Sequence, residues 1–147
     1  MTPDRPTHIT EVGTVFVPVS DQEAALAFYV DTLGFEKTGD FAYGGGHRWV
    51  EVAPSGSPVR LALVPPSEGT SPGGDVVRCA LTSTDIDADH AGLVAAGVDV
   101  DPVVAREGTS RPGLVAAEVT VPDPFPPQVC FRDPDGNRFL IVGPPPG

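Results

Sequence analysis

The sequence predicts an α+β domain made of two copies of one unit, in which a strand and a helix are followed by three strands. Segments with the two-residue alternation of strands are interrupted twice by a helical segment that ends at a glycine. The two halves also resemble each other, because Thr14 aligns with Arg78, and Ser20 with Thr84, in one ungapped comparison. Pro (18) and Gly (17) cluster between the periodic segments, which indicates short turns rather than disorder.

The first unit begins with residues 13–19, where valines alternate with other residues as they do in a strand. Residues 20–23 (SDQE) match a capping box, so Ser20 is expected to cap the helix that follows. Apolar residues then recur at helical spacing until Gly34, which ends the helix. Three further strands are expected at 35–41, 47–52 and 59–64.

The second unit repeats this order. Residues 76–83 are strand-like, residues 84–87 open a helix as residues 20–23 do, and Gly97 ends it. Its later strands are expected at 98–104, 128–131 and 138–142. We expect one domain over residues 1–147. Its parts are a first unit at about 10–66, a linker at 65–74, and a second unit at about 75–144 that contains an insertion at 105–127. An insertion of this length commonly forms a lid or part of a binding site.

The chain carries a formal net charge of −11, from 20 acidic and 9 basic side chains. Such a surface repels phosphate backbones and anionic lipid headgroups, so neither nucleic acid nor a membrane is an expected partner. No stretch reaches the roughly 20 apolar residues of a membrane span. The first residues lack the apolar core of a signal peptide, and the expected location is the cytoplasm. Cys79 and Cys130 lie in apolar runs and are interpreted as structural thiols, in preference to a disulfide or, for Cys130, a nucleophile.

Two motifs carry a resemblance to a known family. Residues 15–21 (VFVPVSD), 25–29 (ALAFY) and 33–35 (LGF) are similar to the first module of vicinal-oxygen-chelate proteins, the glyoxalase/bleomycin-resistance group. Residues 131–137 (FRDPDGN) are similar to the hairpin that closes their second module. The resemblance covers about residues 10–144 without the insertion. It implies two βαβββ modules whose curved mixed sheets surround a central cavity, and chains that frequently pair as homodimers to complete or share it.

The resemblance also indicates where a metal ion would be held. Metal-dependent members use His, Gln or Glu side chains from the first and last strand of each module. These places correspond to Thr14, Ala62, Arg78 and Leu140, with Val76 as the alternative to Arg78. A Thr hydroxyl is a weak donor, an Arg cation repels the ion, and the apolar side chains have no donor atom. We therefore expect no metal and no cofactor.

Residues with the same strand parity are expected to form the inner wall of the cavity; they are Thr14, Phe16, Pro18, Ala62, Arg78, Ala80, Thr82, Arg138, Leu140 and Val142. This mixture is typical of a pocket for an organic molecule. The expected ligand-binding residues are Thr14, Phe16, Trp49, Ala62, Arg78 and Leu140. Trp49, with Phe41 or Tyr43, would stack on a flat ligand, or pack in the core or at a dimer interface instead. Arg78 would hold a carboxylate, phenolate or enolate, or form a structural ion pair.

No pair of acid and base residues stands out, so the sequence assigns no catalytic residue. His8, His47 and His90 are too scattered for a ligand set, and His47 is either a general base near the cavity mouth or a solvated histidine. Glu51 is the one acid inside an apolar strand and is a candidate buried base.

Three functions remain open. The favoured one is metal-independent binding of a partly apolar organic molecule, as in drug or natural-product sequestration by bleomycin-resistance proteins. The second is a cofactor-free isomerase, cyclase or lyase acting on an enolisable substrate. The third is a metal-dependent glyoxalase- or dioxygenase-type enzyme.

Overall fold

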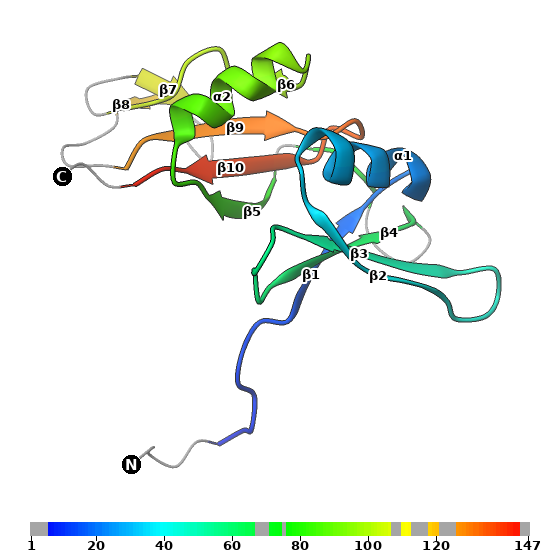
Figure 1. Ribbon diagram of the computed structural model, residues 1–147. Helices are drawn as coiled ribbons and strands as arrows, with labels where there is room; N and C mark the ends of the chain where they lie inside the picture. The colour runs from blue at the N-terminus through cyan, green and yellow to red at the C-terminus, as the bar shows by residue number, and fades with distance from the viewer. Residues whose placement is uncertain are drawn as a thin grey trace.

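A computed structural model describes residues 6–66, 71–74, 76–106, 110–112, 118–120 and 126–144. The first unit contains β1 (Thr14–Pro18), α1 (Gln22–Leu26), a π-helical continuation η1 (Ala27–Thr32), β2 (Glu36–Ala42), β3 (Arg48–Ala53) and β4 (Arg60–Val64). The second contains β5 (Val77–Thr82), α2 (Ile86–Ala95), β6 (Asp99–Val100), β9 (Gln128–Arg132) and β10 (Arg138–Val142), and the predicted insertion holds β7 (Ser110–Pro112) and β8 (Glu118–Thr120). Figure 1 shows the two units as two separate sheets, one above the other.

Each unit forms a four-stranded mixed sheet, and the α+β class with two βαβββ units is confirmed. The strand orders are β1-β4-β3-β2 and β5-β10-β9-β6. In both sheets the first strand runs parallel to the last strand of its unit, and the other pairs are antiparallel. The registers are equivalent, since Phe16 pairs with Ala62 in one sheet and Ala80 with Leu140 in the other. Among the described residues, β1 and β5 therefore each occupy an edge of their sheet.

The helix caps differ from the prediction by one residue. Asp21, not Ser20, caps α1, and its Oδ1 accepts hydrogen bonds from the backbone N–H groups of Glu23 and Ala24. The hydroxyl of Ser20 instead donates to Asp135 in the second unit. Asp85 caps α2 in the same way. A carboxylate one residue further along satisfies the free N–H groups, so the hydroxyl before it is available for a tertiary contact.

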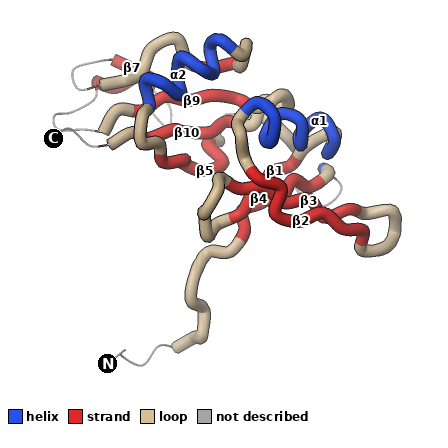
Figure 2. The backbone as a smooth tube through the Cα atoms, viewed as in Figure 1, coloured by secondary structure: helices blue, strands red, loops and turns tan. Residues whose placement is uncertain are grey.

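The core lies on the helix-facing sides of both sheets and is continuous between the two units. Alternation along the strands turns residues such as Val17 and Leu63, both fully buried, toward the helices. Tyr29, on the η1 continuation of α1, packs its ring 6.0 Å from Phe139 of β10. Figure 2 accordingly shows α1 close to the end of the β9–β10 hairpin. Tyr29 thus joins the core of the first unit to that of the second.

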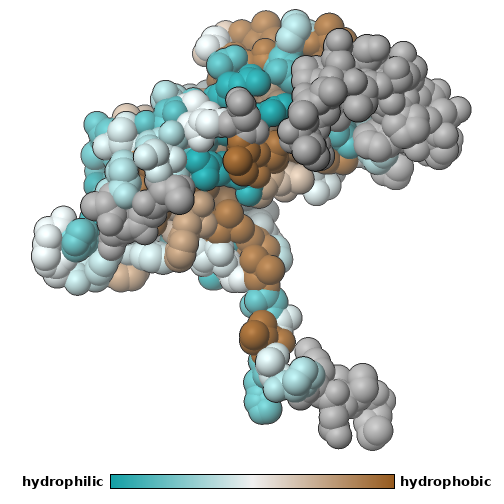
Figure 3. Space-filling view, turned by 180° about the vertical axis from the view of Figure 1, so that it is seen from behind, coloured by the Kyte–Doolittle hydropathy of each residue, from teal (hydrophilic) through white to brown (hydrophobic). Residues whose placement is uncertain are grey.

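The outer side of the first sheet and the N-terminal arm carry hydrophobic side chains that are exposed to solvent, whereas Leu140 and Cys130 on the outer side of the second sheet are buried. Figure 1 shows residues before β1 leaving the body as an extended arm. Figure 3 shows hydrophobic residues gathered along the middle of the back face, down to the base of this arm. The exposed large hydrophobic residues include Ile9, Val12, Phe16, Phe41, Tyr43 and Val76. None of the helices in the described part of the chain has the length and apolarity required to cross a membrane.

Candidate functional site

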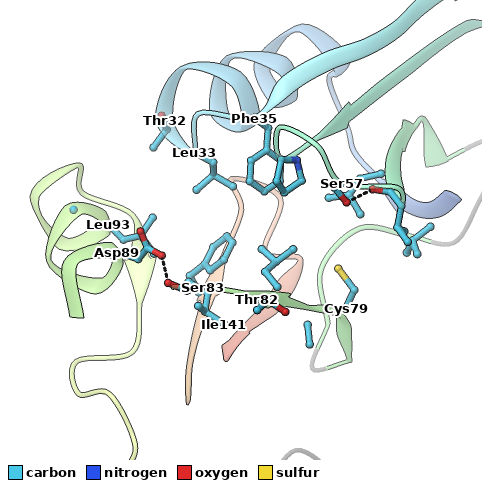
Figure 4. Close-up of a pocket in the computed structure, with 18 of the residues that line it drawn as sticks. Thr32, Leu33, Phe35, Ser57, Cys79, Thr82, Ser83, Asp89, Leu93 and Ile141 are labelled. Carbon is cyan, nitrogen blue, oxygen red and sulfur yellow. Dashed lines mark hydrogen bonds between the residues drawn. The ribbon is translucent and has the colours of Figure 1, made fainter. Parts of the chain in front are cut away.

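A cavity of about 640 Å³ lies between the two units, within the size range of pockets for small organic molecules. Its lining combines the helix-facing side of the first sheet, the end of η1, the β3–β4 loop, α2 and the edge strand β5 (Figure 4). The principal apolar residues are Val15, Leu33, Phe35, Leu61, Leu81, Leu93, Phe131 and Ile141. Successive residues 79–83 all contribute, so the cavity reaches around the free edge of β5.

The hydrogen-bonding groups of this cavity are largely satisfied within the chain. The hydroxyl of Ser83 donates to Asp89 Oδ2, and Figure 4 shows the two side chains pointing toward each other. The hydroxyl of Ser57 donates to the carbonyl of Val59 at 2.8 Å. Burial raises the pKa of the Cys79 thiol, so the thiol stays neutral near neutral pH. The cavity therefore presents mainly apolar surface to a ligand.

None of the six expected ligand-binding residues lines this cavity. Strand alternation places Val15 and Leu61 in it, while Thr14, Phe16 and Ala62 lie on the other side of the same strands. Ala80 and Thr82, which were expected to face inward, do contribute, through the edge of β5. The expected inner wall is the pair of sheet faces turned away from the helices.

Four aromatic side chains cluster on that side of the first sheet, and we call them the aromatic face: Phe16, Phe41, Tyr43 and Trp49. The Trp49 ring is central, with ring centroids 5.9 Å from Phe16, 6.4 Å from Phe41 and 6.5 Å from Tyr43. Phe16 and Phe41 are 59% and 56% exposed, which is unusual for phenylalanine in a folded domain. The cluster is an apolar surface open to solvent within one chain.

The structure brings four of the expected ligand residues together on this side of the sheet. Phe16 contacts Trp49, Ala62 pairs with Phe16 across β1 and β4, and Thr14 lies two residues before Phe16. Ala62 is fully buried, and Thr14 is half-buried. The small Ala62 side chain leaves the neighbouring rings as the dominant surface.

The other two expected residues lie on the second sheet and have different environments. Leu140 is 5% exposed and is flanked in register by Ala80 and Cys130. The Arg78 guanidinium donates to Asn137 Oδ1 at 3.2 Å and to the Gly73 carbonyl at 2.9 Å. Arg78 thus joins the linker to the β9–β10 turn through neutral acceptors, and it forms no ion pair with any residue that the structure describes.

A sequence profile of the Glyoxalase/Bleomycin resistance protein/Dioxygenase superfamily matches residues 7–141. The chain belongs to this superfamily. Among solved structures, the chain is similar to TnmS3, which is described as an antibiotic binding protein from Streptomyces sp. CB03234. The two sequences are 35% identical, the match covers 94% of this chain and 98% of TnmS3, and the TM-score is 0.69. A superfamily member from Sphaerobacter thermophilus DSM 20745 is 33% identical, and the match covers 94% of this chain and 100% of that one with a TM-score of 0.72. The uncharacterised protein YetH of Bacillus subtilis (strain 168) is 28% identical over 137 residues, with 90% of this chain and 98% of that protein covered.

The residues at the superfamily's metal-ligand places do not fit a divalent ion. The fold puts Thr14 and Ala62 on the neighbouring strands β1 and β4, and Arg78 and Leu140 on β5 and β10, as the resemblance implies. Their end groups are a hydroxyl, a methyl, a guanidinium and an isobutyl group, which supply at most one weak donor. The described residues contain no group of three or more His, Cys, Asp or Glu side chains that could hold a metal ion.

The histidines are separated in space. The His47 ring stacks on Tyr43 at 5.6 Å, at the tip of the β2–β3 hairpin beside the aromatic face. A ring nitrogen of His90 lies 2.8 Å from the Asp101 carbonyl oxygen, and His8 is exposed on the N-terminal arm. Glu51 shares the outer side of the first sheet, because it pairs with Ala62. Of the titratable residues singled out from sequence, His47 and Glu51 are therefore the two near the aromatic face.

Sequence reasoning missed two features of this region. The turn residues Asp133 and Asn137 are typical of a hairpin turn, but both side chains are buried. Asn137 ties the turn to β1 and the linker, and Asp133 ties it to η1. The only signal was that Asp133 and Asn137 flank a turn between two strands that contain aromatic residues. The cavity between the units was also missed, because strand parity alone does not say which side of a sheet is filled.

Proposed function

We propose that this superfamily member binds a partly apolar, flat organic molecule on the aromatic face, without a metal ion. The observation that carries the proposal is the central position of Trp49 among three exposed rings on one side of a sheet. Large exposed apolar patches mark interaction sites in soluble proteins, and aromatic rings favour flat partners through stacking. Thr14, which lies two residues before Phe16 on β1, would contact the same ligand, and the buried Ala62 would underlie it.

The similarity to TnmS3 supports a natural-product or drug-like ligand. TnmS3 is described as an antibiotic binding protein, and the similarity extends over nearly the whole of both chains. The donor set at the superfamily's ligand places supports binding that needs no metal. Sequestration of such a molecule would protect the cell that makes or meets it, and it requires no chemical step.

We further propose that two copies pair and that the second sheet of one copy covers the aromatic face of the other. The strands β1 and β5 supply equivalent sheet edges, and exposed Val76 lies next to β5. Such a pairing would turn the open surface around Phe16 into a cavity. Light scattering on the purified protein at micromolar concentration should give twice the chain mass. A monomer that still binds ligand would refute this pairing.

The experiment uses the fluorescence of Trp49, which is the only tryptophan of the chain. A neutral flat probe, 9-methylacridine, should quench this emission in a saturable way. Phe16→Ala should weaken binding about tenfold, because burying an aromatic ring against a ligand contributes about 1–2 kcal/mol. Val94→Ala, a change of an exposed apolar residue on α2, is the matched control and should leave the affinity unchanged. No saturable quenching by flat probes would overturn the proposed function.

The cavity between the units is the competing location, and Cys79 separates the two. A ligand in the cavity should protect Cys79 from a maleimide, because this side chain contributes to the lining (Figure 4). A ligand on the aromatic face should leave the modification rate unchanged while Trp49 is quenched. Cys130 is fully buried and should not contribute to the signal. Recovery of the probe unchanged after long incubation is expected for a binding protein; conversion would favour the cofactor-free enzyme.

A further inference from the structure

We infer that the aromatic face selects a flat ligand carrying a positive charge, with Glu51 as its counter-ion. This inference rests on the proposed function, because it names the class of molecule that the same site takes. It differs from the anionic ligand that Arg78 suggested in the sequence. Three observations carry it: the position of Glu51, its lack of an internal partner, and the engagement of Arg78 elsewhere.

Glu51 lies on the same side of the first sheet as the aromatic cluster. It is two residues from Trp49 along β3, and side chains two apart in a strand lie on the same side. Across the sheet it pairs with Ala62 on β4 and with Gly39 on β2. Because Ala62 also pairs with Phe16, the carboxylate belongs to the same row of side chains as an exposed ring.

The Glu51 carboxylate is held over the backbone of β2. A Cβ atom added at Gly39 would lie 3.1 Å from Glu51 Oε1, so the carboxylate occupies the space that Gly39 leaves open. Glu51 is half-buried. Its carboxylate is therefore confined to the sheet surface beside the rings, and a ligand lying on Trp49 would meet it at the side.

The carboxylate of Glu51 forms no hydrogen bond or ion pair within the part of the chain that the structure describes. The acids on the helix-facing side of the same sheet have partners: Asp40 and Glu23 both bond Arg48, and the Arg48 and Lys37 hydrogen bonds hold the pKa of Asp40 well below its usual range. Arg60, at the start of the neighbouring strand β4, forms no ion pair with Glu51. A half-buried charge without a partner is unfavourable, and an incoming cation would supply that partner.

The surroundings favour a cation over an anion. The face of a tryptophan ring attracts a cation through its quadrupole, and the effect is larger for Trp than for Phe or Tyr. The net charge of −11 concentrates cations near the protein. Among the arginines on the outer sides of the sheets, which would suit an anion, Arg78 is bonded to Asn137 and the linker. Arg60 pairs with Thr14 at the start of β4, beyond the Ala62 that Glu51 faces. An aromatic ammonium or amidinium compound therefore matches the rings and the carboxylate at once.

Three probes of one shape test the inference: 9-aminoacridinium, which is cationic near neutral pH, neutral 9-methylacridine, and anionic acridine-9-carboxylate. Their affinities are measured by Trp49 quenching and by calorimetry at low and high salt. The cation should bind about tenfold more tightly than the neutral probe, and the anion more weakly than both. Glu51→Gln should remove the preference for the cation and leave binding of 9-methylacridine unchanged, which also shows that the variant is folded.

Asp31→Asn is the matched control, since it removes one negative charge from an exposed position on η1, away from the first sheet's outer side. Asp31→Asn should keep the preference for the cation. A general effect of net charge would instead reduce this preference equally in Asp31→Asn and in Glu51→Gln. Equal affinities for cationic and neutral probes, or a preference that survives in Glu51→Gln, would overturn the role of Glu51 while the proposed function stands. If none of the three acridines binds, the proposed function itself fails.

Discussion

The hydroxyl of Tyr29 donates a hydrogen bond to Asp133 Oδ2 at 2.7 Å, across a sequence separation of 104 residues. Tyr29 belongs to η1 in the first unit, and Asp133 opens the β9–β10 turn in the second. Both side chains are buried. The other oxygen of Asp133 accepts from the backbone N–H groups of Asn137 and Asp135. The bond therefore connects the two units at the point where the turn itself is organised.

Replacing Tyr29 by Phe should lower the free energy of unfolding by about 1–3 kcal/mol, because a buried carboxylate loses a donor while ring packing is kept. The measurement is urea denaturation of both proteins. Val94→Ala, on the exposed side of α2, is the control and should change stability by less than about 0.5 kcal/mol. A Tyr29→Phe protein as stable as the parent would show that this bond does not hold the units together.

The same contact predicts a loss of stability at alkaline pH. Burial, and then the Asp133 charge and hydrogen bond, raise the pKa of Tyr29 far above its usual value. Below a pH of about 10, both the folded and unfolded chains keep the Tyr29 proton, and the Tyr29–Asp133 bond makes its full contribution to the free energy of unfolding. Above it, the unfolded chain releases the proton and the folded chain does not, so stability falls by up to about 1.4 kcal/mol per pH unit. In urea titrations, the parent should lose stability above this pH more steeply than Tyr29→Phe; parallel curves would contradict the assignment.

Arg78 should act on stability and not on ligand binding. Arg78→Gln removes the bonds to Gly73 and Asn137, and we expect about 1–2 kcal/mol lower stability. Hydrogen exchange at the Gly73 N–H, which donates to Asn137 Oδ1 at 2.9 Å, should become faster. The affinity for 9-methylacridine should not change. Arg106→Gln, which removes only an exposed ion pair to Asp87 on α2, is the control, and an affinity loss confined to Arg78→Gln would restore the ligand role.

Two glycines of the second unit should respond in opposite directions to alanine. Gly92 lies inside α2, and a Cβ atom there meets nothing within 4 Å. Gly92→Ala should raise stability by about 0.5–1 kcal/mol, because alanine favours the helix. Gly97 ends the same helix with a φ of +76°, where a side chain is strained, so Gly97→Ala should lower stability. Thermal unfolding of both variants tests the pair, and stabilisation by Gly97→Ala would contradict it.

The sequence was sufficient for the order of elements, since alternation and capping signals are local properties. The strands at 128–131 and 138–142 were predicted almost to the residue, and β2, β3 and β4 to within one residue at either end. The first cap was misplaced because serine and aspartate side chains are both common helix caps. Ser20 instead donates to Asp135, which is distant in sequence, and Asp21 caps the helix. The absence of metal donors at Thr14 and Leu140 was also readable, because side-chain chemistry does not depend on packing.

Taken alone, the chain determined which residues share a face, and thus that Phe16 and Ala62 belong together while Val15 and Leu61 form another set. Only the tertiary structure decided which face of the first sheet is covered by helices and which is open. It also decided that Arg78 bonds the linker, while Glu51 has no partner among the described residues. The physical reason is that strand alternation is a local consequence of backbone geometry. Coverage of a face, and the pairing of a charge, depend on segments that meet only when the chain has folded.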